Sequence, residues 1–525
     1  MFYRRDSIQS SWHLPFNSHI RSCVSNSNYR ILNGEREKEF GLCWDFTPII
    51  FVNDNYETFA SNSSSVSSDD FFYSSKINIR FHEFTHYFSL SGTSLGSLYH
   101  ILYAAKLDHI KYVLQILRES TFKNKLKPPF AHSKGFINSQ LSPEIHLYLM
   151  QIIFFDRIKT LFTNSGPFTI NYYYSSLFYF LYYWHANKLI RFGNTRQRQL
   201  MLSLNIEDLI PDRVNFEWFL KPYDYGYYND YNISLISVRD ILEAYAVCNQ
   251  LLIYELLRAS HVIRPQNVKD FANNVLNDEY HHALSFYNRI VNAGNRLEYP
   301  ELIATAIPLL ELTLMTNFHP YLLPKTIPVD WSHSFLIPQR FQELCYYFFS
   351  KNISVKIDDL SDNEYIFQLL DGICNDLNWP KYSKQLDKLK SFNRTFNSWG
   401  RSYFAVNSDF VIEIKRKYGI LPKHQSTSPY AVVYNDFIDD QFENMYLDKE
   451  NIDSNIKNKM YDAKCLRDTE LKVYLFFEQF FYANDFEEFK NVLMKLNQDS
   501  KKNKDQLFKD FLDEFNLESF VDPLS

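Results

Sequence analysis

From residue 98 onward, apolar side chains recur at helical intervals, and this spacing limits the possible folds more than any other feature of the chain. The clearest example is Leu98–Leu117, whose apolar residues fall on two short helices around Asp108 and His109, where a tight turn is needed. Weaker copies of this pattern occupy Ile241–Leu257 and Phe477–Leu493. The spacing predicts a mainly α-helical protein in which short antiparallel helix pairs bury most of the apolar surface.

The first of these segments resembles the ankyrin repeat. Ala104 and Ala105 stand where that family has the small pair between its two helices, and His109 stands at the position of its turn histidine. Asp108 replaces the turn glycine, and the family's period of about 33 residues does not run through the chain. The resemblance implies a degenerate array of helical hairpins that presents a groove to a protein partner.

Composition along the chain predicts three regions. Residues 1–91 form a small irregular and β N-terminal part, with an apolar run at 48–52 that suits a short strand and a serine-rich loop after it. Residues 92–318 form the ankyrin-like helical-hairpin region. Four prolines at 320–338 mark a boundary, and residues 319–525 form a helical C-terminal domain with a charged tail.

Glycine content and charge exclude several common classes of protein. The chain has only 12 glycines in 525 residues, and it lacks the glycine-rich motifs of nucleotide-binding folds and the nucleophile elbow of α/β-hydrolases. The formal net charge is −6, and charges of both signs are mixed along the chain without a long basic run. We therefore expect no nucleic-acid partner.

The N-terminus and the cysteines indicate an intracellular protein. The first residues, Met1–Asp6, lead into a polar segment, so no secretory signal peptide is expected, and no apolar run reaches the ~20 residues of a membrane helix. The six cysteines are scattered, with no C-x-x-C pair, and are expected to be reduced. With its eroded ankyrin-like units, this profile resembles effector proteins that intracellular bacteria inject into host cells. That resemblance implies a cytoplasmic location, including delivery into a host cell without a signal peptide.

One motif in the chain carries chemistry, the H-E-x-x-H sequence from His82 to His86. On a helix, residues i and i+4 share one face, so His82 and His86 can both ligate one Zn²⁺. The motif resembles the signature of the zincin metallopeptidases. That resemblance implies that Glu83 is the general base for the water that attacks the scissile carbonyl.

A working zinc site of this kind needs a third protein ligand, and the sequence leaves its identity open. The extended motif of the metzincins fails, because Ser89 and Gly92 stand at its glycine and third-histidine positions. The remaining candidates are Glu119, Glu144, His100 and His109, and spacing favours none of them.

A strand is the alternative conformation for the motif. Apolar and polar residues partly alternate between 77 and 87, as they do in half-buried strands. On a strand, two residues four apart lie about 13 Å from each other, too far to share one metal ion. The sequence therefore supports two functions. The first is a protein-binding adaptor without a cofactor, acting on an unknown protein partner, and the alternative is a zinc-dependent endopeptidase with His82 and His86 as ligands and Glu83 as base.

Overall fold

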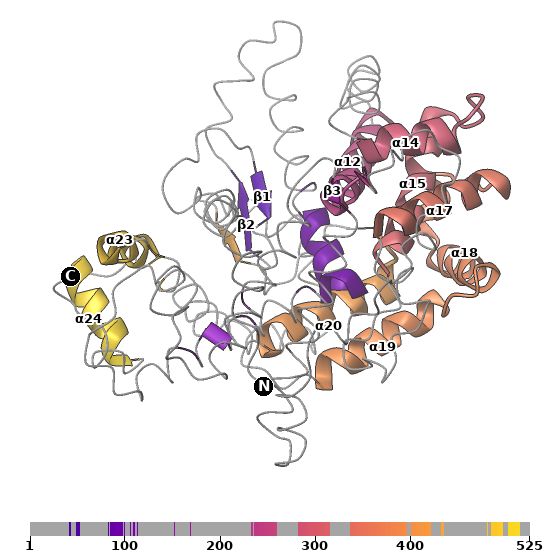
Figure 1. Ribbon diagram of the computed structural model, residues 1–525. Helices are drawn as coiled ribbons and strands as arrows, with labels where there is room; N and C mark the ends of the chain where they lie inside the picture. Colours follow the sequence, from indigo (N-terminus) through magenta and orange to yellow (C-terminus); the bar gives the residue numbers. More distant parts are fainter. Residues whose placement is uncertain are drawn as a thin grey trace, which may run out of the picture.

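A computed structural model gives the arrangement of the chain (Figure 1). The structure describes residues 41–43, 49–52, 82, 84–97, 99, 106, 109–110, 113, 152, 168–169, 233–234, 236–259, 282–315, 337–395, 401–421, 432–434, 480, 483, 485–496 and 502–514. Within these ranges the protein is mainly α-helical, as predicted. None of the helices described is both long enough and apolar enough to cross a lipid bilayer.

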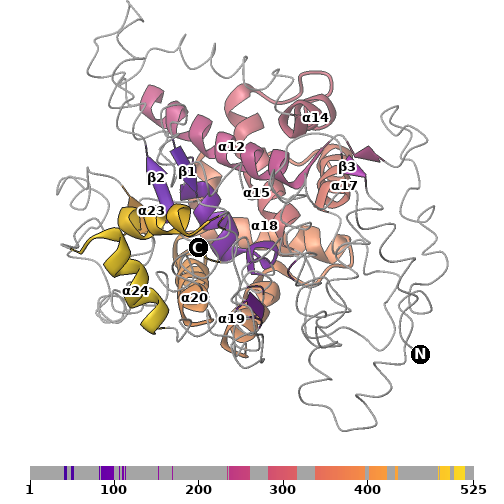
Figure 2. The same ribbon diagram turned by 60° about the vertical axis from the view of Figure 1, so that its left-hand side comes forward.

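Among the described residues, seven helices that pack on one another form the main body. They are α12 (Val238–Ala259), α14 (His282–Val291), α15 (Tyr299–Leu314), α17 (Ile337–Ser350), α18 (Asn363–Asp376), α19 (Tyr382–Thr395) and α20 (Arg401–Tyr418). A short 3-10 helix, η5 (Asp358–Ser361), precedes α18. Figure 2 shows these helices gathered around α15, which packs against α12, α17 and α18.

The centre of this body is α15. Proline at its first turn supplies a backbone angle suited to helix initiation, and every residue from Leu302 to Leu314 is buried. The buried residues of this helix are apolar except for Thr305, Glu311 and Thr313, and a helix that is apolar on nearly all sides belongs in the interior, where neighbours cover each face. Because α17 packs on both α14 and α15, helices from either side of the expected boundary near residue 319 contact each other directly.

Small β-structures accompany the helices. The strands are β1 (Gly41–Cys43), β2 (Ile49–Val52), β3 (Phe168–Thr169), β4 (Ile233–Ser234) and β5 (Val432–Tyr434). In one sheet β1 runs antiparallel to β2, and β2 runs parallel to β5, so residues near 50 pair with residues near 433. In the other sheet β3 and β4 are antiparallel.

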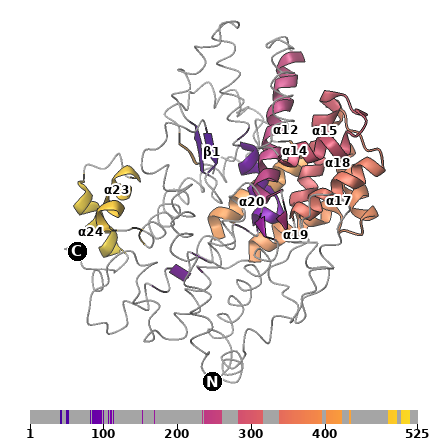
Figure 3. The same ribbon diagram turned by 45° about the horizontal axis from the view of Figure 1, so that its top comes forward.

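The C-terminal helices α23 (Phe486–Leu496) and α24 (Lys504–Glu514) pack against each other. Figures 1 and 3 show them as a yellow pair to one side of the other helices. Their shared core is a cluster of aromatic rings with centroids 4.8–6.3 Å apart, formed by Phe480, Phe486, Phe489, Phe508 and Phe511. Aromatic pairs at such separations prefer offset and edge-to-face arrangements, which pack well between two helices.

The structure corrects one of the three ankyrin-like segments. Ile241–Leu257 is not a helical hairpin, because it lies within the single helix α12. Asn249, in the middle of the segment, is helical, and its side-chain Nδ2 donates a hydrogen bond of 3.0 Å to Tyr245 O one turn earlier. The segment has no glycine or proline to break the helix. Most of the first segment, Leu98–Leu117, lies outside the described residues. In the third segment, Phe477–Leu493, Asp485 is not helical, and α23 begins at the next residue.

The close approach of α20 to the H-E-x-x-H segment depends on Gly92. A Cβ atom at this position would lie 2.4 Å from Val411 Cγ1 and 2.8 Å from Lys415 Cε. We expect Gly92→Ala to lower the free energy of unfolding by about 1–3 kcal/mol, because α20 must move away. Urea denaturation measures the change.

A matched glycine provides the control for this prediction. Gly372 is exposed within α18 and has open space around it. Gly372→Ala is expected to stabilise the protein by about 0.5–1 kcal/mol, through the higher helix propensity of alanine. If both substitutions changed stability in the same direction, the close contact at Gly92 would not be the cause.

Candidate metal centre

The H-E-x-x-H segment forms a helix, which we call the motif helix: His82 and residues 84–92 are helical. The alternative of a strand is therefore wrong. Every described residue of this helix from Phe84 to Gly92 is buried except His86, and His82 is also only partly buried. The two histidines, four residues apart, therefore form the one partly exposed face of the described part of the helix.

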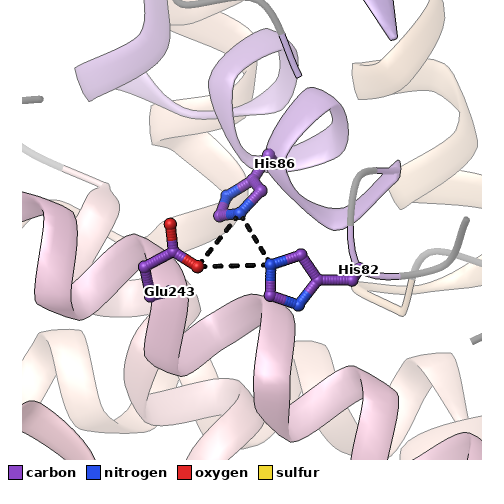
Figure 4. A group of neighbouring side chains, drawn as sticks. All are labelled: His82, His86 and Glu243. Carbon is purple, nitrogen blue, oxygen red and sulfur yellow. Dashed lines mark hydrogen bonds and ion pairs between the residues drawn. The ribbon is translucent and has the colours of Figure 1, made fainter. Parts of the chain in front are cut away.

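The two histidines project from the same face of the motif helix toward a common point (Figure 4). Their Nε2 atoms are 3.2 Å apart, and the rings meet nearly edge to face, with centroids separated by 4.8 Å. Such a short separation of two ring nitrogens fits either a shared proton or a shared metal ion.

Glu243 completes the group from a distant part of the chain. It lies on the second turn of α12, and its Oε2 atom is 3.2 Å from His82 Nε2 and 3.5 Å from His86 Nε2. Within the part of the chain that the structure describes, these three residues are the one group of three or more potential ligands close enough to hold a metal ion.

The triangle of these three atoms has the size that a tetrahedral zinc ion requires. Ligand atoms about 2.0–2.1 Å from Zn²⁺, with tetrahedral angles between them, lie about 3.3–3.4 Å apart. The three separations in the protein are 3.2, 3.2 and 3.5 Å. A single point just outside the plane of the triangle is therefore about 2.0 Å from His82 Nε2, His86 Nε2 and Glu243 Oε2 together.

The local electrostatics favour a charged carboxylate in this position. Burial raises the pKa of Glu243, but the charge of His86 and hydrogen bonds from both imidazoles outweigh this effect and hold the pKa well below its ordinary value. Arg239, one turn earlier on α12, places its Nε atom 3.6 Å from the other oxygen, Oε1. Glu243 is therefore ionised at neutral pH beside a protonated imidazole, and a metal ion would displace that proton on binding.

The start of α12 is fixed by a reciprocal cap, which sets the position of Glu243 along the helix. Ser237 Oγ accepts a hydrogen bond of 3.0 Å from Asp240 N, and Asp240 Oδ2 accepts one of 2.7 Å from Ser237 N. This arrangement satisfies two donors at the end of the helix and defines where the first turn begins. Because Glu243 follows Asp240 by about one turn, the cap also orients the ligand.

The group is accessible from solvent. The exposed fractions of the side chains are 19 % for His82, 12 % for His86 and 29 % for Glu243. A structural zinc site is closed by four protein ligands, whereas a catalytic site has three and keeps one position open. The three candidate ligands agree with a catalytic site in number and in solvent access.

The other residues that the sequence suggested do not join this group. Among the candidates for the third ligand, His109 is described and lies outside the group of three. Glu119, Glu144 and His100 lie outside the described residues, as does the expected base Glu83. The sequence contains one signal for Glu243 that was missed: it is the only charged residue in an otherwise apolar run, Ile241–Val247, that is almost entirely buried.

Cysteine chemistry has no support among the described thiols. Cys248, Cys345 and Cys374 are free and buried. Burial raises the pKa of Cys248 to about 12 and that of Cys374 to about 11. Since the thiolate is the reactive form, these cysteines are inert at neutral pH.

Comparison of the chain with models of known families, with curated proteins and with solved structures found no match.

Proposed function

We propose that the protein is a zinc-dependent hydrolase that cleaves peptide bonds, with His82, His86 and Glu243 as the metal ligands and Glu83 as the general base. The observation that carries this proposal is the triangle formed by His82 Nε2, His86 Nε2 and Glu243 Oε2, whose sides are 3.2, 3.2 and 3.5 Å. Zinc bound there would polarise the substrate carbonyl and lower the pKa of the attacking water.

The residues of the chain have separate tasks in this reaction. The two neutral imidazoles and the single carboxylate leave a net positive charge on a divalent ion, which preserves its strength as an electrophile. Arg239 Nε lies 3.6 Å from Glu243 Oε1, on the side of the carboxylate away from the two histidines. Glu83, next to His82 in the sequence, would accept the proton of the attacking water and pass it to the leaving amine.

The donor set alone would also suit iron. Two histidines and one carboxylate form the facial triad of non-haem iron oxygenases, in which adjacent ligands of an octahedral ion lie about 3.0 Å apart. The separations of 3.2–3.5 Å in this protein suit either ion. The glutamate between the two histidines is a base suited to hydrolysis, and this residue favours zinc.

The adaptor role that the ankyrin resemblance implied gains no comparable support. Of the three segments with the ankyrin-like pattern, Ile241–Leu257 is part of one continuous helix. That helix carries Glu243, so the apolar positions that suggested a repeat serve instead to bury α12 and to hold the candidate ligand.

The identity of the third ligand tests the proposal. We expect purified protein to bind one zinc ion, and Glu243→Gln to weaken that binding at least tenfold, because a neutral amide is a poorer ligand than a carboxylate. Zinc content measured by mass spectrometry after dialysis, and affinity measured by competition with a coloured chelator, give the result.

Four further substitutions are the controls. Glu119→Gln, Glu144→Gln, His100→Ala and His109→Ala remove the other candidate ligands, and each should bind zinc as the wild type does. Iron in place of zinc, or a loss of zinc in one of these variants with Glu243→Gln unaffected, would contradict the assignment.

A further inference from the structure

A fully buried ion pair lies behind the candidate metal centre. Lys415 Nζ on α20 is 2.6 Å from Glu311 Oε1 on α15, and neither side chain has any exposed surface. Taking two charges out of water is costly, and the cost is offset only where each charge is also well hydrogen-bonded. The contacts of this pair therefore indicate what it does.

Two buried tyrosines complete the hydrogen bonding of Glu311. Tyr382 OH on α19 donates to Glu311 Oε1 at 2.6 Å, and Tyr245 OH on α12 donates to Oε2 at 3.1 Å. Tyr245 follows the ligand Glu243 by two residues on the same helix. The carboxylate of Glu311 is thus bonded to the helix that carries the third metal ligand.

Lys415 makes the corresponding contacts with the motif helix. Its Nζ donates a hydrogen bond of 2.9 Å to the carbonyl oxygen of Gly92, and it lies 4.8 Å from the centre of the Phe88 ring. Phe88 follows His86 by two residues, and Gly92 is at the end of the same helix. The absence of a side chain at Gly92 is what lets Lys415 reach the carbonyl.

The pair consequently joins the two elements that carry the metal ligands. Figure 3 shows the motif helix, in indigo, between α12 and α20. From the motif helix the chain of contacts runs through Lys415 and Glu311 to Tyr245 on α12. A metal site tolerates displacements of only about 0.5 Å, so two separate helices need a rigid connection of this kind.

We propose that Lys415 and Glu311 are positioning residues that set the separation between Glu243 and the two histidines. This inference rests on the proposed zinc site. Lys415 is 323 positions from Gly92 in the sequence, and Glu311 is 66 positions from Tyr245. We expect this pair to change zinc affinity about 10–100-fold, as residues that hydrogen-bond to metal ligands do.

The test compares zinc binding in Lys415→Met and Arg340→Met. Arg340 is also a fully buried cation, but its Nε donates to Leu312 O and its guanidinium stacks on Trp379, and neither partner carries a ligand. We expect Lys415→Met to lose about tenfold or more in zinc affinity. Arg340→Met should lose less than about twofold at a temperature where circular dichroism shows both variants folded.

A second pair of variants compares zinc binding in the same way, but each variant removes only a hydroxyl group and no charge. Tyr245→Phe deletes the hydroxyl that bonds Glu311, whereas Tyr287→Phe deletes a buried hydroxyl that bonds Leu302 O at 2.7 Å on α15. Only Tyr245→Phe is expected to weaken zinc binding. It should also alter the visible absorption spectrum of the cobalt-substituted protein, which reports the geometry of the ligands rather than the stability of the fold.

The outcomes separate this inference from the proposed function. If the wild type binds no zinc, the proposed function is wrong and the positioning role is wrong with it. If the wild type binds zinc while folded Lys415→Met and Tyr245→Phe bind it equally well, only the positioning role is overturned. An equal loss in Lys415→Met and Arg340→Met would also overturn it, because general destabilisation would then explain both.

Discussion

Glu83→Gln is expected to abolish peptide hydrolysis while leaving zinc bound. Glutamine keeps the size of the side chain but cannot accept a proton, and loss of a general base typically slows a reaction by about 10²–10⁴-fold. The zinc content should not change, because the proposed ligands are His82, His86 and Glu243, and Glu83 is the proposed base. Incubation with an unbiased peptide mixture, followed by mass spectrometry, detects cleavage at any sequence that the enzyme accepts.

The control for this experiment is a glutamate remote from the site. Glu364 is exposed on α18, where its Oε1 accepts a hydrogen bond from Gln368, and Glu364→Gln should cleave peptides at the wild-type rate. If Glu83→Gln retained full activity, the base would have to be another residue. If it lost zinc as well as activity, Glu83 would instead support the metal site.

His86→Ala is expected to remove zinc from the purified protein altogether. Two ligands remain after the substitution, and the loss should exceed the about 100-fold reached by changes to residues that only support a ligand. The effect on stability should be equally clear. Zinc at 100 times its dissociation constant stabilises a folded protein by about 2.7 kcal/mol, so it should raise the melting temperature of the wild type and have no effect on the variant.

His282→Ala serves as the matched histidine substitution. His282 is exposed at the start of α14 and belongs to no group of ligands among the described residues. Its variant should bind zinc and melt as the wild type does. A zinc-dependent rise in melting temperature that persisted in His86→Ala would place the metal ion elsewhere in the protein.

The sequence predicts one half of the candidate site and not the other. His82 and His86 are recognisable because both lie within one helical turn, and the spacing of four residues alone brings them together. Glu243 is on a different helix, and its place beside the histidines results from the packing of α12 against the rest of the body. Such contacts join residues that are far apart in the sequence, and a search for motifs of fixed spacing does not detect them.

The fold shows the same division between local and tertiary information. The prediction of a mainly helical fold is confirmed for the residues that the structure describes, because the apolar period is a local property. Small and apolar residues in Ile241–Leu257 suggested a helix pair, but the same residues also suit one long helix packed between several neighbours. Where no residue breaks the helix, the pattern of apolar side chains alone does not separate these two arrangements.

The position of Glu243 on a helix made long after the motif helix has a consequence for biosynthesis. While the ribosome is still completing the middle of the chain, the proposed site would have its two imidazoles without the carboxylate, and two donors retain zinc far less firmly than three. In a zinc hydrolase of the proposed kind, the ability to hydrolyse peptides would therefore arise only after α12 has been synthesised and has docked. This order of assembly would keep the enzyme from attacking neighbouring chains, or its own, during translation.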